Sequence, residues 1–200
     1  GTLTLGTSGG TQTYNGGLTT TSVGGTVTVN GTLASSNDAI VFGAVTLGSN
    51  VTIDTNATDT NGDITIGAVT GGDINLTLVT TSTTGSANHT FNGDIRLGSD
   101  GALSVTGDVV LGANVTVVGG GGVTFNNDIN ADNAANNDRT LSLSSGQNST
   151  ITVTGNVGTS QALAGLTIIQ SNQTTFSASV DVSDSNSGTI TLTDTSNDKH

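Results

Sequence analysis

Short stretches of alternating apolar and polar residues recur along the whole chain. Clear examples are residues 26–29 (TVTV), 73–78 (DINLTL) and 150–153 (TITV). A period of two residues places the apolar side chains on one face of a β-strand and the polar side chains on the other. No segment has a convincing apolar stripe at helical spacing. The pattern therefore predicts an all-β chain that is built from many short strands.

A second regularity is a local motif in which an aromatic residue precedes a few small polar residues and then another apolar residue. It occurs as YNGGL at residues 14–18 and as FNGDI at 91–95, with variants at 42–45, 125–129 and 176–180. The one Tyr and all four Phe fall in this context, which indicates an internal repeat. We predict that the structural residues of this repeat are Tyr14, Asn15, Gly16, Phe42, Phe91, Asn92, Gly93, Phe125, Asn126 and Phe176.

Two all-β architectures can use such turns. In an antiparallel sandwich each Asn-Gly pair forms a hairpin turn, whereas in a parallel β-solenoid the turns are the corners of stacked coils. Aromatic residues make up only 2% of the chain, although a sandwich core normally contains more of them. Val, Ile, Leu and Ala suit the narrow interior of a solenoid, and outward Thr and Asn form ladders between coils. We therefore predict one continuous parallel β-helix over residues 1–200, with antiparallel sandwich repeats as the alternative.

Coil size determines the expected dimensions of this β-helix. At roughly 20–25 residues per coil, the chain makes about eight to ten coils. With strands about 4.8 Å apart, the rod is roughly 40–50 Å long. A single coil cannot bury its apolar face alone, so each end needs a cap or a neighbouring repeat segment. The chain begins in mid-pattern with GTLTL, so we expect it to be a piece of a longer repeat protein.

The charge balance excludes one large class of partner. The net charge is −12, and the only basic residues are Arg96, Arg139 and Lys199. Nucleic acid is not an expected partner, because phosphate binding needs clustered Lys and Arg. No apolar run reaches the ~20 residues of a membrane helix, so we expect no membrane insertion. The absence of Cys removes any disulfide framework and fits a bacterial surface protein.

The repeat motifs support a family resemblance. Residues 10–19 (GTQTYNGGLT) resemble the TQTYNG-x-V unit of giant bacterial β-strand-repeat surface proteins related to filamentous haemagglutinin-like adhesins. The segments 141–146, 151–158 and 161–168 are similar to the same proteins. The resemblance implies a right-handed β-helix, an extracellular location on the bacterial cell surface, and a role in adhesion, biofilm or a surface fibre. The chain contains no Pro and thus lacks the Asn-Pro-Asn-Gly stretch of two-partner-secretion adhesins.

Catalytic chemistry is not indicated by the ionisable residues. Some parallel β-helices cleave polysaccharides, which requires clustered carboxylates and usually a basic residue in a groove. Here Arg96 and Arg139 are far apart in the sequence, and His89 stands alone. We therefore predict that the chain is not an enzyme and holds no cofactor.

Because all the acidic residues are Asp and many lie in predicted turns, calcium is the metal whose binding has to be considered. Gly-Asp-apolar units such as residues 62–64 and 107–109 lack the tandem Gly-Gly-x-Gly-x-Asp spacing of a calcium-binding repeat. We interpret their Asp residues as turn formers. The densest acidic stretch contains Asp128, Asp132 and Asp138, and these residues are the candidates if one calcium site exists.

These observations predict a structural or adhesive extracellular repeat protein that forms a rigid fibre, stalk or sheath component. Its expected partners are neighbouring repeat segments or like subunits stacked end to end, together with host or matrix glycans. The alternative is a carbohydrate- or ice-binding solenoid, because Thr-x-Thr arrays such as residues 150–154 present hydroxyl groups. Irregular motif spacing argues against the flat lattice that ice binding requires. Sequons such as those at Asn50, Asn75 and Asn114 are expected by chance in so Asn- and Thr-rich a chain.

Overall fold

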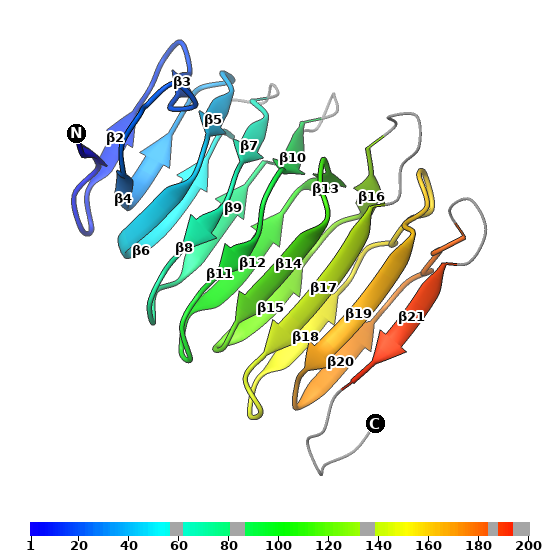
Figure 1. Cartoon of the computed structure of the whole chain (residues 1–200). Helices are drawn as coiled ribbons and strands as arrows, with labels where there is room; N and C mark the ends of the chain where they lie inside the picture. Colours follow the sequence, from blue (N-terminus) through cyan, green and yellow to red (C-terminus); the bar gives the residue numbers. More distant parts are fainter. Residues whose placement is uncertain (57–61, 81–86, 133–138, 184–187, 194–200) are drawn as a thin grey trace.

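The computed structural model describes residues 1–56, 62–80, 87–132, 139–183 and 188–193. Within these ranges the chain forms a parallel β-solenoid of about seven turns, without a helix, and its coils stack along one axis (Figure 1). Every strand pair in the described residues is parallel. The predicted parallel solenoid is confirmed and the antiparallel sandwich is wrong. About seven turns lie within these ranges, against the roughly eight to ten that were expected.

The strands lie on three faces, and the strands of one face pair with their counterparts in adjacent coils; beyond β16 the third face continues only through single bridges at Val157 and Val180. The first face comprises β1 (Leu3–Leu5), the first halves of β4 (Val27–Ala34) and β6 (Val45–Asp54), β8 (Val69–Thr70), β11 (Ile95–Arg96), β14 (Val115–Gly119), β17 (Thr140–Ser145), β19 (Gly165–Gln170) and β21 (Thr189–Leu192). The second face comprises β2 (Thr11–Thr13), the second halves of β4 and β6, β9 (Leu76–Val79), β12 (Ala102–Thr106), β15 (Gly122–Phe125), β18 (Thr150–Val153) and β20 (Gln173–Phe176). The third face comprises β3 (Leu18–Thr19), β5 (Ile40–Phe42), β7 (Ile64–Ile66), β10 (Asn88–Phe91), β13 (Asp108–Leu111) and β16 (Ile129–Ala131).

Equivalent positions stay in register from coil to coil, although the coils differ in length. On the first face the register runs through Thr28, Thr46, Thr70, Arg96 and Val118. These steps are 18, 24, 26 and 22 residues long. The differences fall in the corners, where the chain can lengthen without moving the strands. Sequence motifs are therefore irregularly spaced even though the strands that carry them are aligned.

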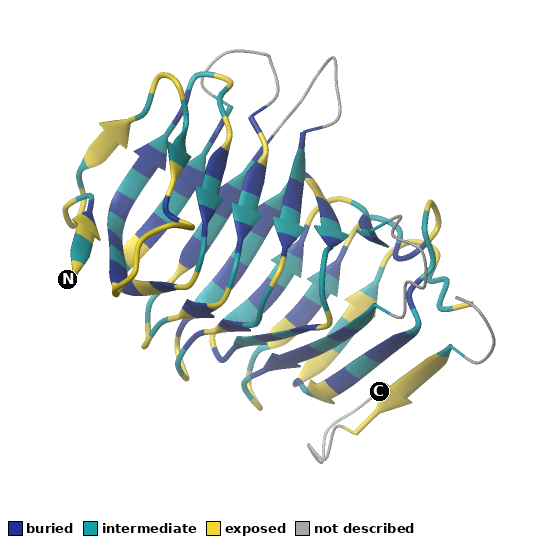
Figure 2. Cartoon of the chain, turned by 45° about the horizontal axis from the view of Figure 1, so that its top comes forward, coloured by how far each residue is buried: buried dark blue, intermediate teal, exposed yellow. Residues whose placement is uncertain are grey.

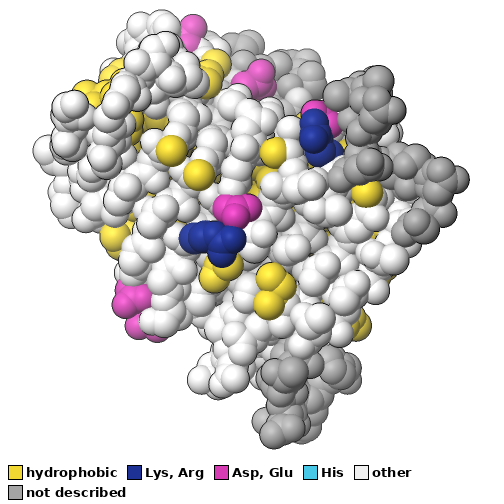
Figure 3. All heavy atoms as spheres, viewed as in Figure 1, with side chains coloured by type: hydrophobic (Ala, Val, Ile, Leu, Met, Phe, Trp, Pro, Cys, Tyr) yellow, Lys and Arg dark blue, Asp and Glu magenta, His cyan; other side chains and the backbone are white. Residues whose placement is uncertain are grey.

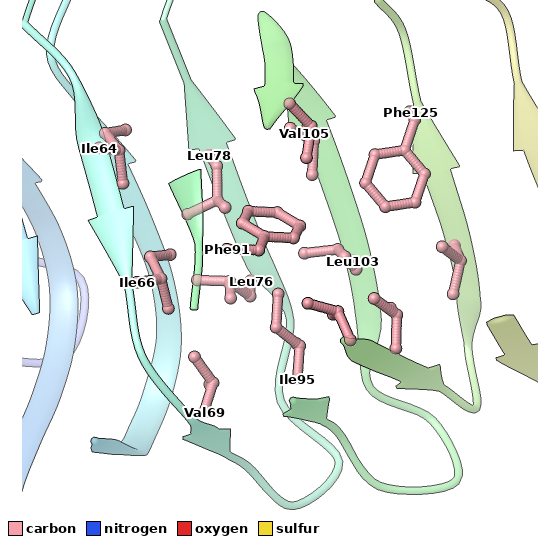
Figure 4. Packing of buried hydrophobic residues seen from close by; sticks show 14 of the residues in the cluster. Ile64, Ile66, Val69, Leu76, Leu78, Phe91, Ile95, Leu103, Val105 and Phe125 are labelled. Atoms are coloured by element: carbon pink, nitrogen blue, oxygen red, sulfur yellow. The ribbon is translucent and has the colours of Figure 1, made fainter. Parts of the chain in front are cut away.

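The interior is filled by columns of apolar side chains from all three faces. One column on the second face runs through Leu33, Ile53, Leu78, Val105, Phe125 and Val153. Each of these side chains is at most 2% exposed, and Figure 2 shows the alternation of buried and less buried positions along the strands. The rings of Phe91 and Phe125 come from different faces and meet with centroids 6.4 Å apart (Figure 4). Because each coil covers the apolar edge of the next, stability arises chiefly from stacking.

The structure divides the aromatic motif between two different corners. Phe42 ends β5 and Phe91 ends β10, so both precede the corner from the third face to the first. Phe125 ends β15, Phe176 ends β20 and Tyr14 follows β2, so these three precede the corner from the second face to the third. The motif thus marks a strand end followed by a corner, and not one fixed position in the coil.

Small residues after the aromatic ring allow the corners of adjacent coils to approach closely. A Cβ on Gly93 would lie only 2.7 Å from the backbone N of Ala68 in the neighbouring coil. After Phe125, the Nδ2 of Asn126 donates to the Oγ1 of Thr106 at 3.1 Å, which links two corners through side chains. The Gly and Asn residues of the motif therefore serve coil-to-coil packing.

Candidate functional surface

The second face presents a continuous column of hydroxyl groups on its outer side. One outward position is Thr or Ser in every coil of this face, and we call this column the hydroxyl ladder. It consists of Thr11, Thr32, Thr52, Thr77, Ser104, Thr124, Thr152 and Thr175. Adjacent parallel strands are about 4.8 Å apart, so the hydroxyl groups repeat at that spacing. Variable coil length does not interrupt the ladder, because the strand register is kept.

Asp and Asn side chains at the start of the third face bind the backbone of the next coil. The Oδ1 of Asp63 accepts a hydrogen bond from the N–H of Asn88 at 3.0 Å. The Oδ1 of Asp108 accepts one from Asp128 at 3.2 Å, and the Oδ1 of Asp128 accepts one from Asn156 at 2.7 Å. These bonds satisfy backbone donors where the chain turns into a strand. The Gly-Asp-apolar units at residues 62–64 and 107–109 thus act as corner connectors between coils.

The three residues named as calcium candidates are not brought together in the described part of the chain. Asp128 precedes β16 and Asp132 follows it, so they lie at opposite ends of that strand. Asp132 accepts from the Nε and Nη2 of Arg139 at 2.9 and 2.8 Å, which raises the pKa of the Arg139 guanidinium. Asp138 lies outside the described residues. No group of three metal-ligating side chains occurs among the residues described.

The second ion pair lies on the first face. The Oδ2 of Asp94 accepts from the Nη2 of Arg96 at 2.7 Å, and its Oδ1 accepts from the N–H of Thr116 at 2.8 Å. Partial burial by itself would raise the pKa of Asp94, but the Thr116 N–H and the Arg96 guanidinium together lower it. Figure 3 shows each basic cluster in contact with an acidic side chain. The two described arginines are therefore both neutralised by neighbouring aspartates.

Several glycosylation sequons are produced by the architecture of the solenoid. The Oδ1 of Asn50 accepts from the N–H of Asn75, and that of Asn75 from Ala102, at 2.9 and 3.0 Å. The Oδ1 of Asn114 likewise accepts from Thr140 at 3.0 Å. In these three cases an Asn, an inward apolar residue and an outward Thr follow one another, at residues 50–52, 75–77 and 114–116. The Asn-x-Thr pattern at these positions is thus explained by coil-to-coil hydrogen bonding.

His89 is a fully buried imidazole in the third face. It occupies an inward position between Ile64 and Val109 of the adjacent coils. Its Nε2 lies 2.9 Å from the carbonyl oxygen of Thr106 and 3.2 Å from the Oγ1 of Thr80. A carbonyl oxygen can only accept, so Nε2 carries the proton and Nδ1 is the bare nitrogen. That Nδ1 is buried without a hydrogen-bond partner.

The surroundings of His89 favour its neutral form. Burial lowers the pKa to about 4, against the smaller opposing effects of the Thr106 carbonyl and the Asp63 carboxylate. Sequence reasoning treated His89 as an isolated residue and missed this role. The sequence could have predicted this burial. His89 and Phe91 are two residues apart in the strand NHTF, so their side chains point to the same face, and Phe91 is a core residue.

Shallow grooves lie near the N-terminal end of the solenoid, and two of them illustrate their character. One is lined by residues 16–19 with Asp38, Ala39 and Val41, and the other by residues 24–27 with small side chains of the next two coils. Among these lining residues Asp38 is the only ionisable side chain, so neither groove offers an acid–base pair. Among the described residues, no helix has the length and apolar character needed to span a bilayer.

No protein-family model, curated protein or solved structure matches this chain. A function must therefore be inferred from the described surfaces themselves. The surface features that bear on function are the rod-like stack of coils, the hydroxyl ladder and the edge strands β1 and β21.

Proposed function

We propose that this chain is a rigid structural segment of an extracellular fibre or stalk on a bacterial surface. The observation that carries the proposal is the continuous register of the apolar column and the hydroxyl ladder on the second face, from coil to coil of the described residues. A rod of this kind has no point at which one half could rotate against the other without breaking strand pairs. Such a rod can act as a spacer that holds the parts of a fibre or stalk on either side of it at a fixed distance.

The distribution of ionisable groups supports a structural role over a catalytic one. Asp63, Asp94, Asp108 and Asp128 all accept hydrogen bonds from the backbone of an adjacent coil. A catalytic acid or base needs to face a substrate rather than hold the fold together. The acidic net charge and absence of Cys, together with the adhesin-like repeat motifs, support an extracellular setting.

Distance measurement between spin labels tests the rigid-rod role directly. The chain contains no Cys, so Thr4→Cys and Thr191→Cys introduce two unique labelling sites at opposite ends of the first face. Eight strand spacings separate β1 from β21, which predicts about 38 Å between the two backbones. A narrow distance distribution near that value supports a rigid spacer, and a broad distribution centred elsewhere contradicts it. Labels at Thr4 and Thr46, two spacings apart, provide the short-distance control at about 10 Å.

A second candidate function, binding of a carbohydrate or ice surface, is favoured by the hydroxyl ladder. The ladder offers uncharged hydroxyl groups at a regular spacing on a flat, rigid sheet face. Glycan-array binding and thermal hysteresis measure the two ligands separately. Thr77→Lys and Thr124→Lys should abolish either activity, whereas Thr65→Lys and Thr90→Lys on the third face are matched controls. Absence of both activities in the unaltered chain excludes this candidate.

A further inference from the structure

The last strand of the first face exposes residues that occupy core positions. Ile190 and Leu192 of β21 pair in register with Leu166 and Ile168 of β19. Those two partners are 1% and 2% exposed, whereas Ile190 is 53% and Leu192 is 63% exposed. Figure 1 shows β21 as the terminal strand of the stack. The inner columns therefore end in two apolar side chains that no described coil covers.

The chemistry of this edge defines what can cover it. The occupant must be an extended segment that pairs in parallel, with apolar residues at alternate positions and small polar residues between them. β1 has this pattern, with Leu3 and Leu5 on either side of Thr4. In the described residues β1 pairs with β4 along one edge, which leaves its other edge facing away from the stack.

The inner columns connect these two edges through the whole rod. The column that begins at Leu3 passes through Val27 and, coil by coil, reaches Ile168 and Leu192. A second copy placed with its β1 on β21 would put its own Leu3 over Leu192 in that same column. Its Thr2 would then lie over Thr191, so apolar and hydroxyl positions both continue across the junction.

Both edges also lack the charges that normally prevent strands from pairing. Residues 1–37 contain no charged side chain, and neither do residues 163–180 or 188–193. Natural edge strands are usually protected by Lys, Pro or inward-pointing charges, and neither β1 nor β21 itself contains any of these. Aspartates flank β21 in the sequence, at Asp181, Asp184, Asp194 and Asp198, but no charged side chain occurs in residues 1–37 around β1, so no like-charged side chains face each other where two copies would meet.

We propose that copies of this chain associate head to tail, with β21 of one copy paired in parallel to β1 of the next. This inference rests on the proposed role as a rigid segment, and it names the partner and the register of the contact. The contact is heterologous, so it can repeat and build a filament rather than close a dimer.

Cysteine trapping tests the register without disturbing the fold. A chain with Leu192→Cys is mixed with a chain that carries Leu3→Cys, and the mixture is oxidised gently. The proposal predicts a covalent dimer for this pair and none for the control pair Ile190→Cys with Leu5→Cys, which is four residues out of register. Equal trapping of both pairs, or of Leu192→Cys with itself alone, would overturn the head-to-tail arrangement.

Sedimentation over a range of concentrations gives a second, independent readout. The unaltered chain should form oligomers that grow with concentration, and Leu192→Asp should weaken association about tenfold or more. Ile169→Asp, at an exposed apolar residue that is 41% accessible on the outer side of β19, is the matched control. A chain that stays monomeric at every concentration refutes the association, whereas the spin-label distance within one monomer tests the rigid-rod role separately.

Discussion

Acidification should destabilise the solenoid through the buried imidazole of His89. The pKa of His89 falls from 6.5 to about 4 in the folded chain, because burial removes the imidazole from water and so disfavours its charged form. At 1.36 kcal/mol per pKa unit, this corresponds to about 3 kcal/mol. The folded state holds the neutral form, so this contribution is fully present above pH 6.5. It is lost as the pH falls towards 4 and changes no further below that value.

The perturbation that isolates this effect is His89→Val. Valine continues the apolar column between Ile64 and Val109 and cannot be protonated. Urea unfolding at pH 7.5 and pH 4 should show the unaltered chain losing about 3 kcal/mol more stability than His89→Val over that interval. Aspartates with lowered pKa values, such as Asp73 and Asp94, contribute equally to both proteins, so they cancel in the comparison.

Two controls make the result decisive. Ile64→Val removes one methylene from the adjacent position of the same column, so it should cost about 1 kcal/mol at both pH values. Nuclear magnetic resonance of the His89 ring should show titration near pH 4 or unfolding before it titrates. Equal acid sensitivity of the unaltered chain and His89→Val, or ring titration near pH 6.5 in the folded state, would refute the reasoning.

Three further outcomes follow from packing and hydrogen bonding. Phe91→Ala should lower the free energy of unfolding by about 3–5 kcal/mol, because the ring is fully buried. Phe176→Ala, in a partly buried end position, should cost clearly less, and equal costs in urea titration would argue against core burial as the cause. Gly107→Ala should lower the melting temperature strongly, because φ is 119° and a Cβ would collide with the preceding coil; an unchanged melting curve would contradict this geometry. Calcium should release no heat in calorimetry and leave the melting temperature unchanged, because the carboxylates of Asp128 and Asp132 already bind protein donors; binding heat with a raised melting temperature would show otherwise.

The alternation of apolar and polar residues predicted most of the side chains that fill the core. Leu76 and Leu78 in the segment DINLTL are both buried, and the Thr between them belongs to the hydroxyl ladder. Alternation of this kind follows from strand geometry alone, because successive side chains must point to opposite faces. The scarcity of aromatic residues then favoured the narrow interior of a solenoid over a sandwich. Both inferences depend on neighbours in the chain, so the sequence by itself contained them.

Contacts between coils were decided only by the tertiary structure. Phe42 and Phe125 share one sequence motif but lie before different corners, and the partner of each corner Asp is about twenty or more residues away. Coil length varies in the corners, so local sequence does not determine which residues lie above one another. The same holds for Ile190 and Leu192, whose alternation is identical to that of buried strands. Only the stack shows that they stand at its edge, because burial in a solenoid depends on the coil that follows and not on the strand itself.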